Sequence, residues 1–284
     1  MGKANKVKGE LIDVNEMVQL IQVLKDIADN KFFTLLSQKD RFTRFGESFV
    51  EFFRMISFTK AKHPLIENDN PKVGIVVVTA EGSFLGEFNN KIIRTALEEK
   101  ENYSQSTFIA VGDKCVRRLE LIQPDIKGFI NYETKGLYEI ALEIKDYLVK
   151  EVMEGRLGKV KVVYSFPKSF EIQKPRAVDL LPCVELIKKQ SQHQILEKII
   201  EESNTLDLIG KLADLWLGAR LYEILFDTII AAAAAQSKML DDSLEKMKKE
   251  QVIVKAKYRK AKKGDIDNSL REVFSARMVM ANKK

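Results

Sequence analysis

The chain has 284 residues, 45% of them apolar and 31% charged, which is long enough for one large domain or two small ones and typical of a globular protein with a heavily charged surface. Only six residues are proline, which excludes long proline-rich linkers. The formal net charge of +6 allows a nucleic acid or an acidic protein as a partner without choosing between them.

Cysteine usage and hydropathy indicate the cellular compartment of the chain and its relation to membranes. Cys115 and Cys183 lie far apart with no C-x-x-C pair, which favours a reducing compartment and argues against a disulfide framework. Residues 1–17 lack the continuous apolar core of a signal peptide, and no stretch approaches the ~18 uncharged apolar residues of a membrane span. We therefore expect any membrane association to come through a partner.

An apolar residue recurs at every seventh position near the N-terminus. A companion column three residues further along, from Met17 to Phe52, contains the polar residues Lys31 and Gln38. An ideal helix drifts by ~20° per heptad, so an apolar stripe kept at period seven predicts a long helix that supercoils against another helix. Two ordinary amphipathic helices are the alternative. The unbroken column comprises Val14, Ile21, Ala28, Leu35, Phe42, Phe49 and Ile56.

The middle of the chain has a different pattern. Short apolar runs predict strands, and between and after them longer amphipathic stretches predict helices. Because strand and helix alternate, we expect an α/β unit with a mainly parallel sheet. The predicted strands are VGIVVV, FIAVG and VKVVYSF, and the predicted helices are NNKIIRTALEEKEN, DKCVRRLELI and GLYEIALEIKDYLVKEVMEG.

A second heptad column follows in the C-terminal part, where no proline occurs after Cys183. A helix over residues 204–263 would be about 90 Å long at ~1.5 Å per residue. Its companion column begins apolar at Leu215 and becomes polar by Gln236, so one flank of the stripe turns toward water. The unbroken column comprises Leu212, Ala219, Phe226, Ala233, Leu240, Met247, Val254 and Ala261.

Together these elements predict the fold class. We expect a Rossmann-like α/β body inserted between two long terminal helices that form an antiparallel coiled coil. The expected divisions are an N-terminal coiled-coil helix over 1–60, an α/β body over 71–203 and a C-terminal coiled-coil helix over 204–284. Such a shape suits the transmission of force or position better than the binding of a small substrate.

The loop TAEGSFLGEFNN, residues 79–90, follows a predicted strand and precedes a helix, which is also the outline of a nucleotide-binding unit. Its two glycines, Gly82 and Gly86, lack the G-x-G-x-x-G spacing, and the loop lacks the G-K-[ST] ending of a phosphate loop. Glu81 and Glu87 would repel a phosphate placed there. The loop therefore favours a tight strand-to-helix turn over a nucleotide site.

Other sequence motifs typical of catalytic or metal sites are missing from the chain. His63 and His193 lie in different parts of the chain, outside any H-x-x-x-H or H-E-x-x-H setting, and no G-x-S-x-G occurs. The carboxylate neighbours Asp241 and Asp242 would point apart on a helix. We expect no catalytic, cofactor-binding or metal-binding residues in this chain.

Between residues 246 and 263 the chain carries nine basic residues and a single acid, Glu250. A solvated helix face is the usual explanation of a charge run. A nucleic acid is a possible partner, but Tyr258 is the only aromatic residue there, so a stacking platform is missing. An acidic protein surface would satisfy the charges equally well.

Several segments in this order resemble the gamma subunit, the central rotor, of F-type ATP synthases. VLKDIADNK resembles the family segment ending Val-Ala-Ala-Ser-Lys, with Lys31 on its lysine, and AKHPLIE resembles its Lys-His-Pro turn. VGIVVVTAEGSFLGEFN resembles the strand followed by Ser-Asp-Arg-Gly-Leu-Cys-Gly-Gly-Phe-Asn, and GDKCVRRLE a glycine-led helix. YRKAKKGDIDNSLREVFS resembles the terminal motif Tyr-Asn-Arg-Ala-Arg-Gln-x-x-Ile-Thr-x-Glu-Leu.

The chain departs from the family at several of these positions. The arginine and one glycine of the loop motif are missing, since residues 81–87 read EGSFLGE. The terminal Arg-Gln becomes Lys262-Lys263, Ile-Thr becomes Ile266-Asp267, and Glu-Leu becomes Ser269-Leu270. These departures leave open a standard synthase subunit or a divergent paralogue that serves another ATP-driven machine.

The resemblance implies a rotor that couples shaft rotation to ATP synthesis or hydrolysis on a surrounding ring of alpha and beta subunits, and to ion transport. It implies no catalytic role for the chain itself, further partners in an epsilon-type subunit and a membrane rotor ring, and a peripheral position on the cytoplasmic face of a membrane. A coiled-coil adaptor and a nucleic-acid-binding protein are the alternatives. The residues expected to meet the ring are Lys31, Arg259, Lys260, Lys262 and Lys263.

Overall fold

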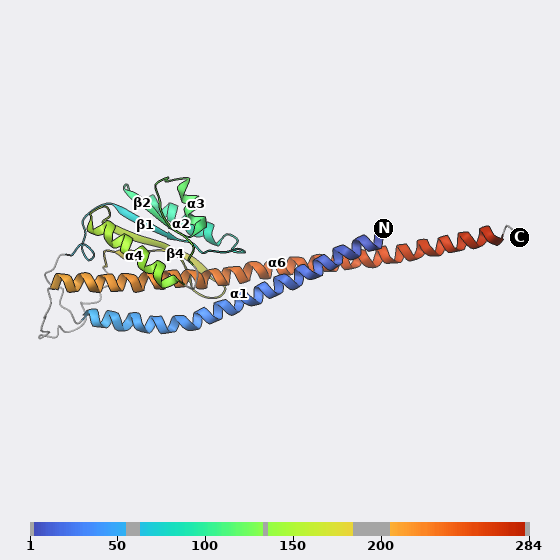
Figure 1. Cartoon of the computed structure of the whole chain (residues 1–284), viewed down its shortest axis with the longest axis horizontal. Helices are drawn as coiled ribbons and strands as arrows, with labels where there is room; N and C mark the ends of the chain where they lie inside the picture. The colour runs from blue at the N-terminus through green and yellow to red at the C-terminus, as the bar shows by residue number, and fades with distance from the viewer. Residues whose placement is uncertain (1–2, 55–62, 133–135, 184–204, 282–284) are drawn as a thin grey trace. The chain divides into compact units, whose positions relative to one another are not determined.

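A computed structural model describes residues 3–54, 63–132, 136–183 and 205–281 of the chain. Two long helices, α1 (Lys3–Arg54) and α6 (Thr205–Ala281), lie at its ends in sequence (Figure 1). The chain divides into two compact units, one formed by Met1–Ala28 with Ser237–Lys284 and the other by Asp29–Gln236. Each long helix contributes to both units.

The larger unit is built on a five-stranded sheet with the order β3-β2-β1-β4-β5. Its strands are β1 (Val73–Val78), β2 (Ser106–Val111), β3 (Lys127–Phe129), β4 (Lys159–Pro167) and β5 (Gln173–Leu181). All neighbouring strands are parallel except β4 and β5, which pair antiparallel. Every residue of β1 is buried, because helices cover both faces of a parallel sheet.

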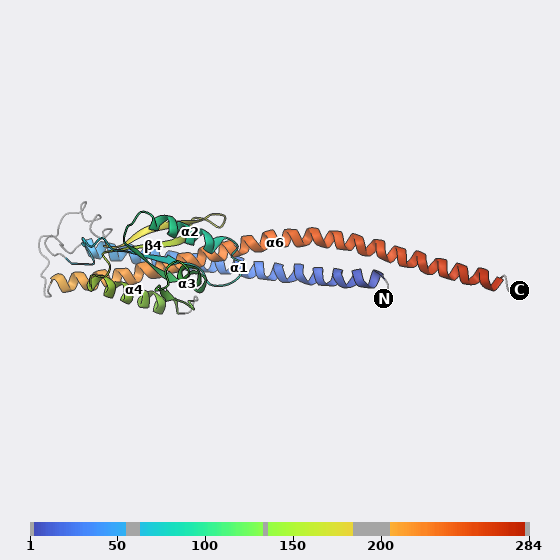
Figure 2. The same ribbon diagram turned by 90° about the horizontal axis from the view of Figure 1, so that it is seen from above.

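The two faces of the sheet carry separate cores. On one face, Ile75 and Phe108 pack with α2 (Phe88–Lys100) and α3 (Asp113–Glu120). On the other, Val76 and Ile109 pack with α4 (Leu137–Met153) and with the parts of α1 and α6 that belong to this unit. Figures 1 and 2 show α2 and α4 on opposite sides of the strands. The mixed α/β fold with long terminal helices is therefore confirmed.

The smaller unit consists of the first part of α1 and the last part of α6, which run antiparallel, side by side in Figure 2. Gln251 Nε2 donates a hydrogen bond to Asn15 Oδ1 over 2.8 Å, while Lys25 lies 3.6 Å from Asp241, so the partner number falls in α6 as it rises in α1. Exposure along α6 alternates in steps of three and four residues, the spacing of a coiled-coil seam. The positions with this spacing, all buried or half-buried, are Leu240, Leu244, Met247, Gln251, Val254, Tyr258, Ala261 and Asp265.

The unbroken heptad columns are confirmed wherever side chains are described. In α1, Ala28 and Leu35 are buried and Val14 and Ile21 half-buried, whereas Phe42, Phe49 and Ile56 lie outside the described side chains. The column of α6 is buried or half-buried from Leu212 to Ala261.

The companion columns were only partly right: Leu24 and Tyr222 are half-buried and Ile229 is buried, but other members are exposed. Met17 is 48% exposed, Leu215 is 60% exposed, and Lys31 and Gln38 are exposed as well. In a heptad the second seam position lies three residues from the first on one side and four on the other, and both helices use the four-residue step here. The true companions in α1 are Val18, Lys25, Phe32 and Lys39.

Three predicted strands and three predicted helices of the body are confirmed, and two strands were missed. β3 has only three residues, too few for a period to show. β5 contains Pro175 and the charged residues Lys174, Arg176 and Asp179, and it lies at the free edge of the sheet, where proline is tolerated. The helix α6 ends at Ala281, so it continues beyond residue 263, which was used for the length estimate. Part of the expected body, residues 184–203, lies outside the described residues.

No described helix is long and apolar enough to cross a membrane.

Candidate partner-contact surface

The loop after β1 is held by its own side chains. Asn89, which is 5% exposed, accepts a hydrogen bond from the Ala80 N–H over 3.0 Å and donates one to the Ala80 carbonyl over 2.9 Å. One amide side chain thus satisfies both backbone groups where the strand ends. The predicted strand-to-helix connection is present, as a loop over residues 79–87.

The amino end of α3 opens beside this loop, and the free N–H groups of a helix's first turn can bind an anion. Here the Asp113 N–H donates a hydrogen bond to Glu81 Oε1 over 2.9 Å. Gly112 has a φ of +103°, and a Cβ there would lie 2.5 Å from Thr79 Oγ1. The chain's own carboxylate therefore occupies the position in which an anionic ligand would be held.

The same loop also reaches α6. Gln236 Nε2 donates a hydrogen bond to the Ser83 carbonyl over 3.3 Å. Leu85, 6% exposed, belongs to the same core as Ala231 and Ala232 of α6. Alanine side chains let the loop approach the helix closely, so the loop ties the α/β body to its long helix.

Polar clusters suited to catalysis or metal binding are scarce in the described part of the chain. No group of three or more His, Cys, Asp or Glu side chains that could hold a metal ion occurs among the described residues. Burial raises the pKa of Cys115 to about 12, which makes this thiol a poor nucleophile. His63 forms a turn, its carbonyl accepting from the Ile66 and Glu67 N–H groups.

Four of the five predicted contact residues lie together on α6. Arg259, Lys260, Lys262 and Lys263 are all exposed, while Ala261 between them is half-buried in the seam. Their spacing of three and four residues places them as neighbours on the outer surface of the helix. None of the four makes an ion pair with any residue that the structure describes, so their charges are available to a partner.

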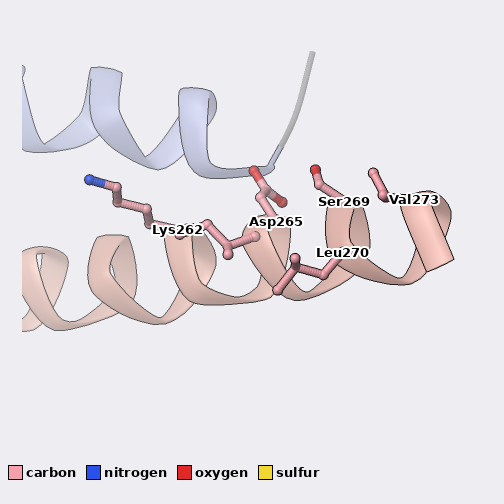
Figure 3. A pocket seen from close by; sticks show the side chains of 6 residues that line it. Lys262, Asp265, Ser269, Leu270 and Val273 are labelled. Carbon is pink, nitrogen blue, oxygen red and sulfur yellow. The ribbon is translucent and has the colours of Figure 1, made fainter.

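A hollow of about 360 Å³ lies next to these residues, where α1 begins (Figure 3). The Ala4 N–H donates a hydrogen bond to Asp265 Oδ2 over 3.1 Å, which ties the start of α1 to α6. Figure 3 shows Asp265 between the two helices, with Ser269 and Val273 further along α6. Beyond this point α6 carries exposed apolar residues: Ile266, Leu270, Val273, Phe274 and Met278.

The fifth predicted residue, Lys31, lies in the other compact unit, where its side chain is exposed on α1. It occupies a position outside the seam, between the buried residues Ala28 and Phe32. Exposure is compatible with a partner contact, and the contact remains a prediction.

The sequence reasoning missed a buried polar cluster. Lys39 Nζ lies 2.5 Å from Asp227 Oδ1 and 4.9 Å from the centre of the Phe166 ring. The guanidinium of Arg176 stacks on the same ring at 3.9 Å and donates hydrogen bonds to the Tyr164 hydroxyl. The cluster joins α1, α6, β4 and β5. A heptad count made with the four-residue step would have placed Lys39 in the seam.

The family profile and the similar proteins all point to one family. The sequence profile of the family described as ATP synthase matches residues 3–278. An ATP synthase gamma chain from Desulfotalea psychrophila is 20% identical over 96% of this chain and 97% of its own length. One from Glaesserella parasuis is 25% identical over 75% of this chain and 76% of its own length.

Solved structures share the fold. A chain in the Euglena gracilis mitochondrial ATP synthase (OSCP/F1/c-ring, rotational state 3) superposes with a TM-score of 0.66 at 17% identity, over 99% of this chain and 96% of that one. One from the central stalk and c-ring of the Tetrahymena thermophila mitochondrial ATP synthase gives 0.61 at 16% identity, over 79% and 99%. Because the family profile spans almost the whole sequence, the chain belongs to the ATP synthase gamma-chain family.

Proposed function

We propose that this chain is the central rotor subunit of an F-type rotary ATP synthase or ATPase. The observation that carries the proposal is the family match over residues 3–278, which includes both long helices and the α/β body. A rotor of this kind turns inside a ring of alpha and beta subunits and couples its rotation to ATP synthesis or hydrolysis there, and to ion transport through a membrane rotor ring.

The antiparallel helix pair supports the role of a shaft. Two helices joined along a seam resist bending and twisting better than one, and hydrogen bonds and ion pairs between them keep their relative position. Leu85 of the loop packs in one core with α6, and Gln236 of α6 donates a hydrogen bond to the same loop. These two contacts support the transfer of torque between α6 and the α/β body. The chain is thus built to move as a mechanical element.

We infer that the chain is not catalytic and that the nucleotide sites lie on the ring subunits. The hydrogen bond between the Asp113 N–H and Glu81 supports this, because a carboxylate of the chain already takes a donor at the amino end of α3 and would repel a phosphate there. The four exposed basic residues, Arg259, Lys260, Lys262 and Lys263, would meet carboxylate-bearing loops of the ring. Lys31 would contribute a further contact from α1.

The position of the chain follows from the same proposal. The subunit would lie at the cytoplasmic face of a membrane, held there by an epsilon-type subunit and the membrane rotor ring. The departures from the family's loop within residues 81–87, where the arginine and one glycine are missing, keep both a standard synthase subunit and the rotor of a divergent ATPase within the proposal.

Co-assembly tests the proposal. The chain would be expressed with alpha and beta subunits from the same organism, purified through a tag on beta, and assayed for ATP hydrolysis and for rotation of a bead attached to the α/β body. We expect a stable complex that rotates in one direction while it hydrolyses ATP. Recovery of the chain without the ring would contradict the proposal, and retention of duplex DNA at low salt would favour a nucleic-acid partner instead.

A further inference from the structure

Polar side-chain pairs cross the seam between α1 and α6. Within the smaller unit, Asn15 Oδ1 accepts a hydrogen bond from Gln251, and Lys25 Nζ lies 3.6 Å from Asp241 Oδ1. Within the larger unit, Lys39 Nζ lies 2.5 Å from Asp227 Oδ1. Lysine at a seam position is uncommon in a coiled coil, because its charge has to be paired or solvated.

The spacing of the two lysine–aspartate pairs is the same on both helices. From Lys25 to Lys39 the chain advances by two heptads along α1, and from Asp241 to Asp227 it goes back by two heptads along α6. The pairs therefore belong to one antiparallel register, which the Asn15–Gln251 hydrogen bond shares.

A slip of the helices by one heptad would break both pairs. In one direction Lys25 would meet Ala234 and Lys39 would meet Arg220, and in the other Lys25 would meet Lys248 and Lys39 would meet Ala234. Each slip thus sets one lysine against an alanine and the other against a like charge. Apolar seam residues alone would tolerate these slips, because the heptad pattern repeats itself.

We propose that the Lys25–Asp241 and Lys39–Asp227 pairs lock α1 and α6 into this one register. The Lys39 pair carries more of the specificity, since Asp227 is 1% exposed whereas the side chain of Asp241 is 65% exposed. Lys39 is also held against the Phe166 ring of β4, so a slip at this point would have to leave the body as well.

The register decides how far α6 extends beyond the first turn of α1. Each heptad of slip would lengthen or shorten by about 10 Å the part of α6 that extends beyond the first turn of α1. A rod whose end must reach a fixed partner cannot tolerate such a change. The lock is a property of the fold and holds whether or not the proposed rotor function is correct.

Cross-linking between engineered cysteines in the full chain measures the register. Asn15→Cys is combined in separate proteins with Gln251→Cys, the observed partner, and with Leu244→Cys or Tyr258→Cys, the partners after one heptad of slip. A thiol–thiol cross-linker shorter than one heptad rise distinguishes them. Cys115 and Cys183 can remain, because both are buried. With the native pairs in place we expect position 15 to cross-link to position 251 alone.

The lock is then removed by Lys25→Leu, Lys39→Leu, Asp227→Leu and Asp241→Leu together. We expect the cross-linking yield at positions 244 and 258 to rise about tenfold relative to the yield at position 251, because the slipped registers no longer leave a charge unpaired. A chain with Lys25→Arg and Lys39→Arg keeps both charges and should still cross-link at 251 alone.

A second variant guards against misfolding of the leucine protein. Asp227→Asn with Asp241→Asn removes the two acids with almost no change of shape, and its helix content is checked by circular dichroism. The same rise at positions 244 and 258 is expected. If both folded variants still cross-link at position 251 alone, the two ion pairs do not set the register and the proposal is overturned.

Discussion

Lys39 of α1 and Asp227 of α6 form an ion pair in which the lysine nitrogen lies 2.5 Å from the carboxylate oxygen. Asp227 is 1% exposed, and its neighbours along α6 are mainly alanine and aliphatic residues. A buried carboxylate is stabilised by the charge of its partner and destabilised by the loss of its hydration. The effect of removing one partner therefore measures how these two contributions balance.

Removing the lysine alone should destabilise the chain strongly. Lys39→Met leaves Asp227 without its nearest counter-charge, and we expect the free energy of unfolding to fall by about 3–5 kcal/mol. The double variant Lys39→Met with Asp227→Leu should recover most of that loss, because an apolar pair needs no hydration. Urea unfolding followed by circular dichroism measures both.

An exposed pair provides the control. Lys249 and Glu245 lie 2.6 Å apart on the surface of α6, with both side chains about 70% exposed. Lys249→Met should change the free energy of unfolding by no more than about 0.5 kcal/mol. Equal effects of Lys39→Met and Lys249→Met would contradict the assigned role of burial.

The pH dependence of stability should report the same carboxylate. Burial raises the pKa of Asp227 above its ordinary value of 3.8, and the charge of Lys39 opposes the shift only in part. The native state therefore holds the proton more tightly than the unfolded chain does, so the free energy of unfolding falls as pH rises from 3.8 through the native pKa.

The isosteric variant Asp227→Asn isolates this effect. Its free energy of unfolding should increase relative to that of the original chain as pH rises through the same window, and the difference should level off above the native pKa. Urea titrations of both proteins at a series of pH values from about 4 upward measure it. A difference that shrinks with rising pH would show that the native pKa is lowered instead.

Alanine substitutions at Gly112 and Gly82 would separate the cost of a steric clash from the cost of backbone strain. Both have a positive φ, +103° and +106°, that L side chains rarely adopt. A Cβ on Gly112 would meet Thr79 Oγ1 at 2.5 Å and the Thr79 carbonyl oxygen at 2.8 Å, whereas one on Gly82 would meet nothing within 4 Å. We expect Gly82→Ala to cost about 1 kcal/mol of unfolding free energy and Gly112→Ala about 2–4 kcal/mol. Thermal and urea melts of both variants measure these costs. Equal costs would show that a small shift of the neighbouring atoms relieves the clash at Gly112.

The isolated chain should not bind ATP. Glu81 already accepts the hydrogen bond of the Asp113 N–H at the amino end of α3, and Glu87 adds a second negative charge to the loop. Titration calorimetry of the purified chain with MgATP should give no more heat than dilution. Micromolar affinity would contradict this reading of the loop, and its loss in Gly112→Ala would then locate the site there.

The basic residues of α6 should act together. Exposed ion pairs contribute about 0.2–1 kcal/mol each, so Lys262→Ala alone should leave the assembled complex nearly unaffected. Reversal of Arg259, Lys260, Lys262 and Lys263 to Glu should stall or uncouple it, because four attractions become repulsions. ATP hydrolysis and rotation of the reconstituted complex are the measurements.

Four exposed basic residues of the α/β body form the matched control for that reversal: Lys91, Arg94, Lys150 and Lys168. Their reversal changes the net charge by the same amount but leaves the shaft intact. Coupling that is normal in the α6 variant, or lost equally in both, would show that this surface of α6 makes no specific contact.

Periodicity determined much of the architecture in advance. The heptad column from Val14 to Leu35 and the column from Leu212 to Ala261 sufficed to predict two long paired helices, because only a supercoiled helix keeps one face buried at period seven. Runs such as VGIVVV predicted parallel strands, since a strand covered on both faces has no polar side. The exposure of the four clustered basic residues of α6 also follows from their places outside the column.

Other features depended on residues distant in sequence, and the tertiary structure alone decided them. The second seam column, with Lys25 and Lys39, needed the partner helix, because a lysine is acceptable there only when an aspartate of α6 lies opposite. Likewise, the strand β5 is stable only as the antiparallel neighbour of β4, and Glu81 occupies the amino end of α3 only because β1 and β2 are adjacent. Local patterns determine which face of an element is buried, whereas the identity of its partner is decided by contacts that form when the whole chain folds.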